Sequence, residues 1–330
     1  DVCSSDLPSS SNTKQVASFF VGQSISLSIA CTSLFSQFLA NNHVYLAFTQ
    51  NCGTYILLAF FMLARLKKSK KPLHTAWWKY LIVAFIDAEA NCLIVKAYEY
   101  TTILSVMLCD AMTIPSVFVL SWIFLHTKFQ KRHFVAAILC LVGLALMIIT
   151  DAKKSTPGAK QPIIGDIMAL SASVLYAISN ICQEVLVKSD DWKEFLGMMG
   201  VGGSVVSFIE VLLFDKNQLR TIQWTPNIIF YLCGYIVCLF AMYVITALFL
   251  QKNDAVVFNM HLLTSDIIAA VLTYFFFDDP PTLMYFVALA ITIVGVVVYN
   301  SKQPVNSLET QLMVEDVESK SSAADRKSVV

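Results

Sequence analysis

Charged residues are scarce in this sequence: they make up 14% of its 330 residues, whereas 57% are hydrophobic. Soluble domains average roughly a quarter charged residues, so the composition excludes an ordinary water-soluble fold. The formal net charge is zero, which gives no basis for nucleic-acid binding. What the sequence has instead is a series of hydrophobic runs of about 20 residues, the length that crosses a lipid bilayer.

The sequence also lacks the motifs on which intramembrane enzymes depend. It contains no HExxH motif, no DHHC-type cysteine cluster and no pair of GxGD and YD aspartate motifs. Its nine cysteines form no CxxC pair, and all but Cys3 lie in hydrophobic runs, where they act as small packing residues. Without a filter sequence or a ring of like charges, a channel is also disfavoured. We therefore expect no enzyme activity, metal or cofactor.

The hydrophobic runs predict an all-α polytopic membrane protein with ten transmembrane helices. The expected spans are residues 16–40, 44–66, 77–98, 101–125, 131–150, 163–188, 193–214, 226–250, 255–277 and 282–300. Residues 1–15 are rich in Ser and Asn and predict a short disordered arm, and the polar residues 301–330 predict a disordered tail.

The positive charges predict the orientation in the membrane, because Lys and Arg in short loops stay on the cytosolic side. Most of them, including the groups at 65–79, 128–132 and 188–193, fall on the side that also holds both termini. An even number of spans requires the same arrangement. We expect both termini in the cytosol, and the membrane to be the plasma membrane or the Golgi membrane.

A weak internal repeat divides the chain into two halves, 16–150 and 163–300, joined by a non-cytosolic loop at 151–162. With a constant offset, Thr101 falls on Asn253, and Gly143 falls on Gly295. Five helices per half, an odd number, give the halves opposite topology, and such inverted repeats commonly build transporters. The sequence therefore predicts two inverted five-helix repeats.

The third expected helix carries ionisable residues near its middle, where they are costly and usually face a cavity or a partner. Asp87, Asn91 and Tyr98 share one stripe of this helix, which we expect to line a cavity. Glu89 and Lys96 share another stripe. For these two, ties to neighbouring helices and a role in solute contact or proton coupling remain equally open.

The fourth expected helix combines polar groups with a proline. Thr102 and Ser105 lie along one face, with Asp110 beside it. Pro115 cannot donate a hydrogen bond to the carbonyl of Ala111, so we expect a kink next to the polar face. A kink alone is usually architectural, but the aspartate at the same depth favours a functional site.

The sixth and ninth expected helices carry two further polar stripes. Asn259 and Asp266 are seven positions apart and share a face of the ninth helix. The stripe on the sixth helix consists of Ser173, Tyr176, Asn180 and Glu184. Such faces suit a polar heterocycle or a sugar, although hydrogen bonding between helices remains the alternative.

Several motifs together resemble a known family. They are WWKY, DAEAN, AYEYTTILSV, IP and LSW, followed by GD and LYAISNICQE, and they keep order and spacing over about residues 16–300. The sequence is similar to subfamily F of solute carrier family 35, within the drug/metabolite transporter superfamily that includes the nucleotide-sugar transporters. The resemblance implies ten helices in two inverted halves, a central cavity, alternating access and cytosolic termini.

The resemblance also implies site residues and substrates. The F branch is similar to carriers of nucleobase- or nucleoside-like compounds, including queuine-type micronutrients. Where close relatives have paired acids near the end of the sixth helix, this chain has Gln183 and Glu184. The positions that match the family motifs are Asp87, Glu89, Asn91, Tyr98, Thr102, Ser105, Asp110, Tyr176, Ser179, Asn180, Glu184 and Asp266.

Three functions remain open from the sequence. The first is a transporter of a small polar heterocycle, and the second is a nucleotide-sugar transporter of the Golgi or endoplasmic reticulum. The third is a receptor or scaffold that has lost transport. The partners we expect are a small-molecule solute and the lipid bilayer, not nucleic acid, and a homodimer is compatible with the sequence.

Overall fold

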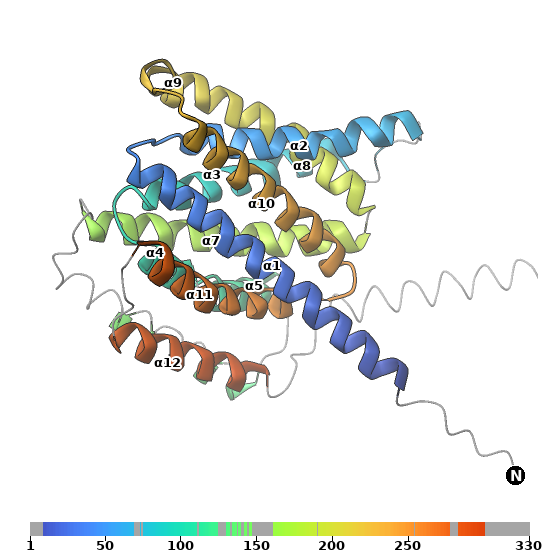
Figure 1. Cartoon of the computed structure of the whole chain (residues 1–330). Coiled ribbons are helices and arrows are strands. Elements are labelled where there is room, and N and C mark those ends of the chain that lie inside the picture. Colours follow the sequence, from blue (N-terminus) through green and yellow to red (C-terminus); the bar gives the residue numbers. More distant parts are fainter. Residues whose placement is uncertain are drawn as a thin grey trace, which may run out of the picture.

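The computed structural model consists of helices joined by turns and short loops. The residues that it describes are 9–68, 73, 75–110, 112–124, 130–146 in part, 161–189, 191–253, 255–277 and 283–300. No strand occurs in these ranges. The first helices are α1 (Ser9–Asn41), α2 (Ala47–Lys68), α3 (Trp77–Ala97), α4 (Ile103–Asp110) and α5 (Thr113–Phe124). They are followed by α7 (Pro162–Ser189), α8 (Trp192–Glu210), the π-helical turn η1 (Val211–Asp215), α9 (Lys216–Thr221), α10 (Pro226–Leu250), α11 (Ala255–Phe277) and α12 (Leu283–Asn300) (Figure 1).

Five described helical segments are long and apolar enough to cross a membrane. They are Phe19–Asn41, Ala47–Lys67, Pro162–Lys188, Trp192–Thr221 and Pro226–Leu250. The α3 helix has sufficient length, with 21 residues, but its charged side chains exceed what such a segment normally carries. The chain is therefore an all-helical, multi-pass membrane protein.

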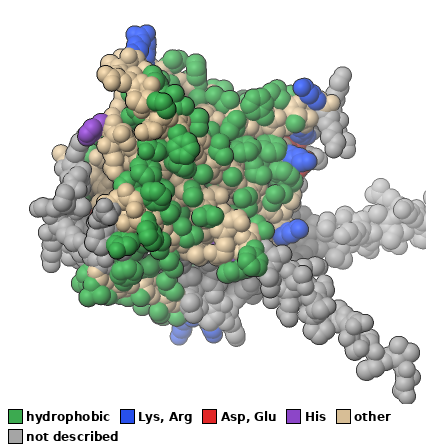
Figure 2. All heavy atoms as spheres, in the orientation of Figure 1, with side chains coloured by type: hydrophobic (Ala, Val, Ile, Leu, Met, Phe, Trp, Pro, Cys, Tyr) green, Lys and Arg blue, Asp and Glu red, His purple; other side chains and the backbone are tan. Residues whose placement is uncertain are grey.

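The surface of the molecule has the character expected of a protein in contact with lipid. Figure 2 shows hydrophobic side chains over most of the described face, with Lys and Arg side chains at its edges. Large apolar side chains such as Phe230, Phe275 and Leu283 are exposed. In water such a continuous apolar surface would drive association, whereas hydrocarbon solvates it.

Two expected helices differ in the structure. The expected span 101–125 is divided, because α4 ends at Asp110 and α5 begins at Thr113. Pro115 lies in the first turn of α5, where its missing N–H costs nothing, so the chain breaks before the proline instead of kinking at it. Much of the expected span 131–150 lies outside the described residues, although those described between 131 and 146 are largely helical.

The amino-terminal helix also begins earlier than expected. We expected a disordered arm over residues 1–15, and α1 begins at Ser9. The sequence contains no Gly or Pro between Pro8 and Gly22, so nothing in it interrupts the helix there. The candidate membrane span within α1 starts at Phe19, close to the expected 16.

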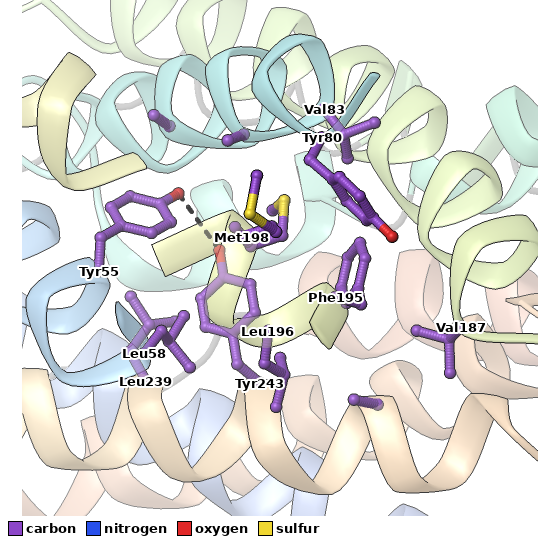
Figure 3. Close-up of a cluster of buried hydrophobic side chains, with 14 of the residues drawn as sticks. Tyr55, Leu58, Tyr80, Val83, Val187, Phe195, Leu196, Met198, Leu239 and Tyr243 are labelled. Atoms are coloured by element: carbon purple, nitrogen blue, oxygen red, sulfur yellow. Dashed lines mark hydrogen bonds between the residues drawn. The ribbon is translucent and has the colours of Figure 1, made fainter. Parts of the chain in front are cut away.

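Among the described helices, α2 and α8 approach each other to backbone contact. A methyl group built on Gly200 would lie 2.1 Å from the backbone nitrogen of Ala59, and one on Gly197 would lie 2.5 Å from that of Met62. Small residues allow membrane helices to approach to backbone contact, where dispersion forces between the helices are greatest. The buried side chains around this contact include Leu58, Phe195, Leu196 and Met198 (Figure 3).

A buried ion pair joins the same two helices. The Arg65 guanidinium contacts the Glu194 carboxylate, and that carboxylate also accepts a hydrogen bond of 3.1 Å from the Tyr80 hydroxyl of α3. Glu194 is fully buried. Breaking one side of such a pair leaves an uncompensated charge, so α2, α3 and α8 are held as one unit.

We predict that Gly200→Ala destabilises the protein by about 1–3 kcal/mol, because the new methyl group meets backbone that cannot move aside. Gly53→Ala is a matched control: the atoms nearest to its methyl group, at 2.4 Å and 2.9 Å, belong to the Ile236 side chain, which can rotate, and not to backbone. Thermal unfolding of the purified proteins in detergent measures both. Equal melting temperatures for the two variants would contradict this account of the α2–α8 contact.

Candidate functional site

A cavity lies between α1, α3, α4, α5, α7, α10 and α11. Its volume, measured as the space open to the centre of a water-sized sphere, is about 90 Å³. One water needs about 10–15 Å³ by this measure, so the cavity has room for several. Its lining includes polar groups, among them Asp87, Asn91, Asp110, Tyr176 and Asn180, and apolar walls that include Ile29, Ile94, Leu239, Phe258 and Leu262.

The carboxylate of Asp87 is the most heavily hydrogen-bonded group at the cavity. It accepts hydrogen bonds from Tyr55 Oη at 2.7 Å, Asn91 Nδ2 at 3.2 Å and Ser179 Oγ at 2.9 Å. The Tyr243 hydroxyl donates to it as well. These donors come from α2, α3, α7 and α10, so one carboxylate joins four helices. Figure 3 shows the Tyr55 and Tyr243 hydroxyl groups pointing toward one another.

Asn91 extends this network toward α7. Its Oδ1 accepts a hydrogen bond from Tyr176 Oη at 2.8 Å, and its Nδ2 lies 2.6 Å from Tyr243 Oη. The side chains of Asp87 and Asn91 are each 3% exposed. Buried polar groups are retained where they are satisfied, and this network satisfies them with one carboxylate, one amide and three phenols.

A second set of polar groups lines another part of the cavity. Asp110, at the end of α4, accepts a hydrogen bond from Thr113 Oγ1 at 3.3 Å, so a carboxylate marks the break between α4 and α5. Asn180 Nδ2 donates to Asn259 Oδ1 at 3.4 Å. Gln183 Nε2 is buried without a hydrogen-bond partner among the described residues. That amide is therefore a donor that a solute in the cavity could use.

Six of the residues predicted from the sequence line the cavity. Asp87 and Asn91 of α3 lie there together with Tyr98, which directly follows the last residue of that helix. The other three are Asp110, Tyr176 and Asn180. Tyr98 also donates a hydrogen bond of 2.9 Å to Ser33 Oγ, which brings α1 into the wall.

Several predicted residues do not line the cavity, and four of them are in contact with each other, with lining residues or with Asp166. Thr102 Oγ1 accepts a hydrogen bond of 3.3 Å from the Ser105 backbone nitrogen and so caps the start of α4. Ser105 Oγ donates to Asp166 Oδ1 at 2.5 Å. Ser179 contacts Asp87 from behind the cavity wall, and Asn259 holds Asn180. These residues support or position the lining residues.

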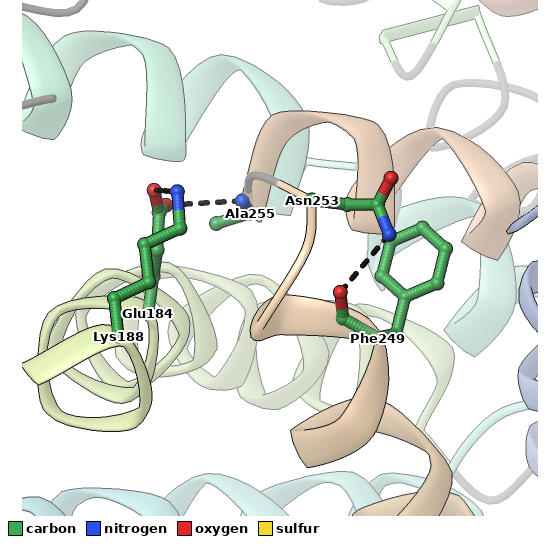
Figure 4. Close-up of polar contacts among 5 residues, drawn as sticks. All are labelled: Glu184, Lys188, Phe249, Asn253 and Ala255. Carbon is green, nitrogen blue, oxygen red and sulfur yellow. Dashed lines mark hydrogen bonds and ion pairs between the residues drawn. The ribbon is translucent and has the colours of Figure 1, made fainter. Parts of the chain in front are cut away.

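Glu184 holds the turn between α10 and α11 (Figure 4). Its Oε2 accepts a hydrogen bond of 3.0 Å from the backbone nitrogen of Ala255, the first residue of α11, and its Oε1 pairs with Lys188 Nζ at 2.9 Å. A carboxylate is favourable at the positive end of a helix. In the same turn Asn253 Nδ2 donates to the carbonyl of Phe249 at 3.0 Å.

The remaining predicted residues lie elsewhere. Glu89 lies near Glu210 of α8, close enough for the two carboxyl groups to interact electrostatically. Lys96 Nζ lies 4.6 Å from the centre of the Phe48 ring. Neither residue lines the cavity, and no ion pair forms between them among the described residues. The side chain of Asp266 lies outside the described part of the structure.

The sequence analysis missed the phenols that surround Asp87. Tyr235 and Tyr243, both on α10, line the cavity, and Tyr55 of α2 lies behind it. Tyrosines anchor at the membrane surface when they lie near helix ends. Tyr235 and Tyr243 instead lie in the middle of a hydrophobic run, eight positions apart on one side of the helix. This central position is the feature of the sequence that could have indicated a role at the cavity.

Comparison with known proteins identifies the family. The family model for SLC35F, solute carrier family 35, matches residues 11–301. This chain belongs to solute carrier family 35. It is 33% identical over 291 residues to mouse solute carrier family 35 member F2, covering 85% of this chain and 77% of the relative. The Xenopus tropicalis member F2 is 32% identical over 268 residues, which cover 77% of this chain and 68% of the relative.

Two further proteins are more distantly similar to this solute carrier. An uncharacterized solute carrier family 35 member of Schizosaccharomyces pombe is 30% identical over 289 residues, 86% of this chain and 57% of that protein. A crystal structure of another protein has a TM-score of 0.61 at 12% identity, covering 86% of this chain and 96% of that chain, and it shows the fold alone. The family assigns this solute carrier to the membrane transporters, as the motifs predicted.

We predict that Tyr243→Phe lowers solute uptake at least about tenfold, because a hydrogen bond to a charged group contributes roughly 1.5–3 kcal/mol. Tyr231→Phe is the control, since this tyrosine lies on the same helix and stacks its ring on Phe38 at 4.8 Å. Uptake per molecule of reconstituted protein is the measurement. Wild-type uptake by the Tyr243 variant would show that its phenol is not needed at the site.

Proposed function

We propose that this solute carrier binds a small polar heterocycle, nucleobase- or nucleoside-like and neutral or positively charged, in the cavity beside Asp87. The solute crosses the membrane by alternating access, in which the cavity opens to one side and then to the other. The observation that carries this proposal is the chemistry of the cavity wall. A queuine-type compound is one member of this class.

The cavity wall supplies hydrogen-bond partners of both kinds between apolar surfaces. Asn91, Asn180 and Gln183 offer amide donors and acceptors, and Asp87 and Asp110 offer carboxylate acceptors. The edge of a nucleobase carries alternating donors and acceptors, and its flat faces are apolar. Apolar side chains such as Leu239, Phe258 and Leu262 suit those faces.

The charge of the cavity wall argues against a phosphate-bearing solute. Two carboxyl groups, those of Asp87 and Asp110, lie among the lining residues, and none of the lining residues in the described part of the chain is Lys or Arg. Nucleotide sugars carry phosphates, which proteins usually bind with cationic side chains. The nucleotide-sugar alternative is therefore disfavoured by the electrostatics of this site.

The proposal includes an arrangement of ten helices as two inverted five-helix halves, 16–150 and 163–300, joined by residues 151–162. The short arm and the tail 301–330 lie in the cytosol, and the membrane is the plasma membrane or the Golgi membrane. The break between α4 and α5 supports this arrangement, because discontinuous helices commonly form the solute sites of repeat-built transporters.

We predict that proteoliposomes of the purified chain show saturable uptake of a radiolabelled nucleobase or nucleoside and none of a nucleotide sugar. Asn180→Ala and Asp110→Ala should each reduce this uptake strongly while the protein remains in the vesicles. Asn217→Ala is the matched control, because Asn217 is an exposed residue of α9. Uptake of nucleotide sugars alone would move the protein to the other transporter class. Binding without any flux would favour a receptor. Uptake at the wild-type level by both cavity variants would contradict the proposed site.

A further inference from the structure

One face of α7 presents three polar side chains to the solute cavity. Tyr176, Asn180 and Gln183 lie at positions i, i+4 and i+7 of this helix, so they form one stripe, and all three line the cavity. Tyr176 Oη donates to Asn91 Oδ1 at 2.8 Å, and Asn180 Nδ2 donates to Asn259 Oδ1 at 3.4 Å. Gln183 differs from both, because its Nε2 has no hydrogen-bond partner among the described residues.

The amide nitrogen of Gln183 is buried as well as unpartnered. Gln183 is 3% exposed, so it has almost no contact with solvent. Burying an N–H group without an acceptor costs free energy, and native proteins retain such a group where a ligand or an ordered water satisfies it. The Gln183 amide therefore indicates a place in the cavity for an acceptor atom of the solute.

The hydroxyl groups of the cavity wall are largely engaged within the protein. The four tyrosines that line the cavity donate their hydroxyl groups to the side chains of Ser33, Asn51, Asp87 and Asn91. The hydroxyl group of Thr32 donates to a carbonyl of its own helix at 2.8 Å. A hydroxyl group has one proton, so one that already donates has none to offer a solute. This leaves amide groups as the donors that a solute acceptor can meet.

Asn180 supplies a second donor beside Gln183. Side chains three positions apart are neighbours on the surface of a helix. The amide nitrogen of Asn180 carries two protons, and its contact with Asn259 Oδ1 uses one of them. A carbonyl oxygen has two lone pairs, so it can accept from both amides at once.

The turn of α7 that carries Gln183 is held in place. The next residue, Glu184, accepts a hydrogen bond of 3.0 Å from the backbone nitrogen of Ala255, which ties this turn to the start of α11 (Figure 4). Phe258 and Leu262, four positions apart on α11, line the same cavity with apolar surface. The amide donors thus lie on a fixed element, and the cavity also offers surfaces that suit the faces of a flat ring.

From this arrangement we propose that Asn180 and Gln183 form a subsite that binds a carbonyl oxygen of the solute. The subsite selects oxo-substituted nucleobases over amino-substituted ones, because an amino group turns its own protons toward two N–H donors and leaves both unpaired. This inference rests on the proposed transport function, which it deepens by naming the group that the cavity recognises. Gln183 is the residue that determines this specificity.

Hypoxanthine and adenine are the probes for this subsite. They share one ring system and differ at position 6, where hypoxanthine has a carbonyl oxygen and adenine has an amino group. We predict that hypoxanthine inhibits uptake of a radiolabelled nucleobase by wild-type proteoliposomes at least about tenfold more strongly than adenine. Gln183→Met keeps the length of the side chain and removes the donor. It should weaken inhibition by hypoxanthine at least about tenfold and leave inhibition by adenine unchanged, which a general loss of structure would not do.

Gln223→Met is the matched control, because Gln223 is exposed in the loop before α10. This variant should keep the wild-type preference for hypoxanthine. Equal inhibition by the two bases in the wild type would overturn the subsite and leave nucleobase transport intact. A preference that persists in Gln183→Met would do the same.

Melting temperatures of the purified proteins in detergent separate this inference from the proposed function, since a ligand that binds the folded protein raises the melting temperature without any flux. The subsite predicts a larger increase with hypoxanthine than with adenine in the wild type, and equal increases in Gln183→Met. That result in a protein without nucleobase uptake would support the subsite and refute the transport function. Uptake without this difference would overturn the subsite alone, and neither uptake nor a shift with either base would overturn both.

Discussion

The carboxylate of Asp87 is held inside the helical bundle by hydroxyl and amide donors from α2, α3, α7 and α10. An ionisable group at this depth is costly, and the cost is offset only where several donors converge on it. The convergence fixes the relative positions of four helices and places Asn91, Tyr176 and Tyr243 around one volume. The cavity and its proposed solute chemistry both depend on this one interaction.

The rest of the bundle divides into a closely packed part and a hydrogen-bonded part. Gly197 and Gly200 bring α2 and α8 into backbone contact, and the Arg65–Glu194 ion pair secures the same interface. Around the cavity, polar contacts predominate, such as Glu184 at the start of α11 and Asp110 at the break before α5. Hydrogen bonds of this kind can exchange partners, whereas backbone-to-backbone packing cannot shift by small steps. A transporter needs both: a fixed interface and a polar region that can rearrange.

The sequence predicted the class of the protein, and some of the residues that it singled out lie together at one cavity. The stripe of Asp87, Asn91 and Tyr98 was predicted to line a cavity and does so, because residues on one face of a helix meet the same surroundings. Helical periodicity does not tell which neighbour a face meets. For that reason Ser105 and Glu184 were expected at the cavity and lie at Asp166 and at the start of α11 instead. The phenol of Tyr55 was missed because the contact between α2 and α3 is a tertiary feature that no local pattern specifies.

The most direct test of the role of Asp87 is solute counterflow by Asp87→Asn in proteoliposomes, with the melting temperature of the same protein measured in detergent. The substitution keeps the shape of the side chain: an amide oxygen can accept from Tyr55 and Tyr243 while the amide nitrogen donates to Ser179, so only the charge is removed. We predict a melting temperature close to that of the wild type and counterflow reduced at least about tenfold, as expected for the loss of charge-assisted hydrogen bonds to a solute. Counterflow at the wild-type rate in the folded variant would contradict the central role given to this carboxylate.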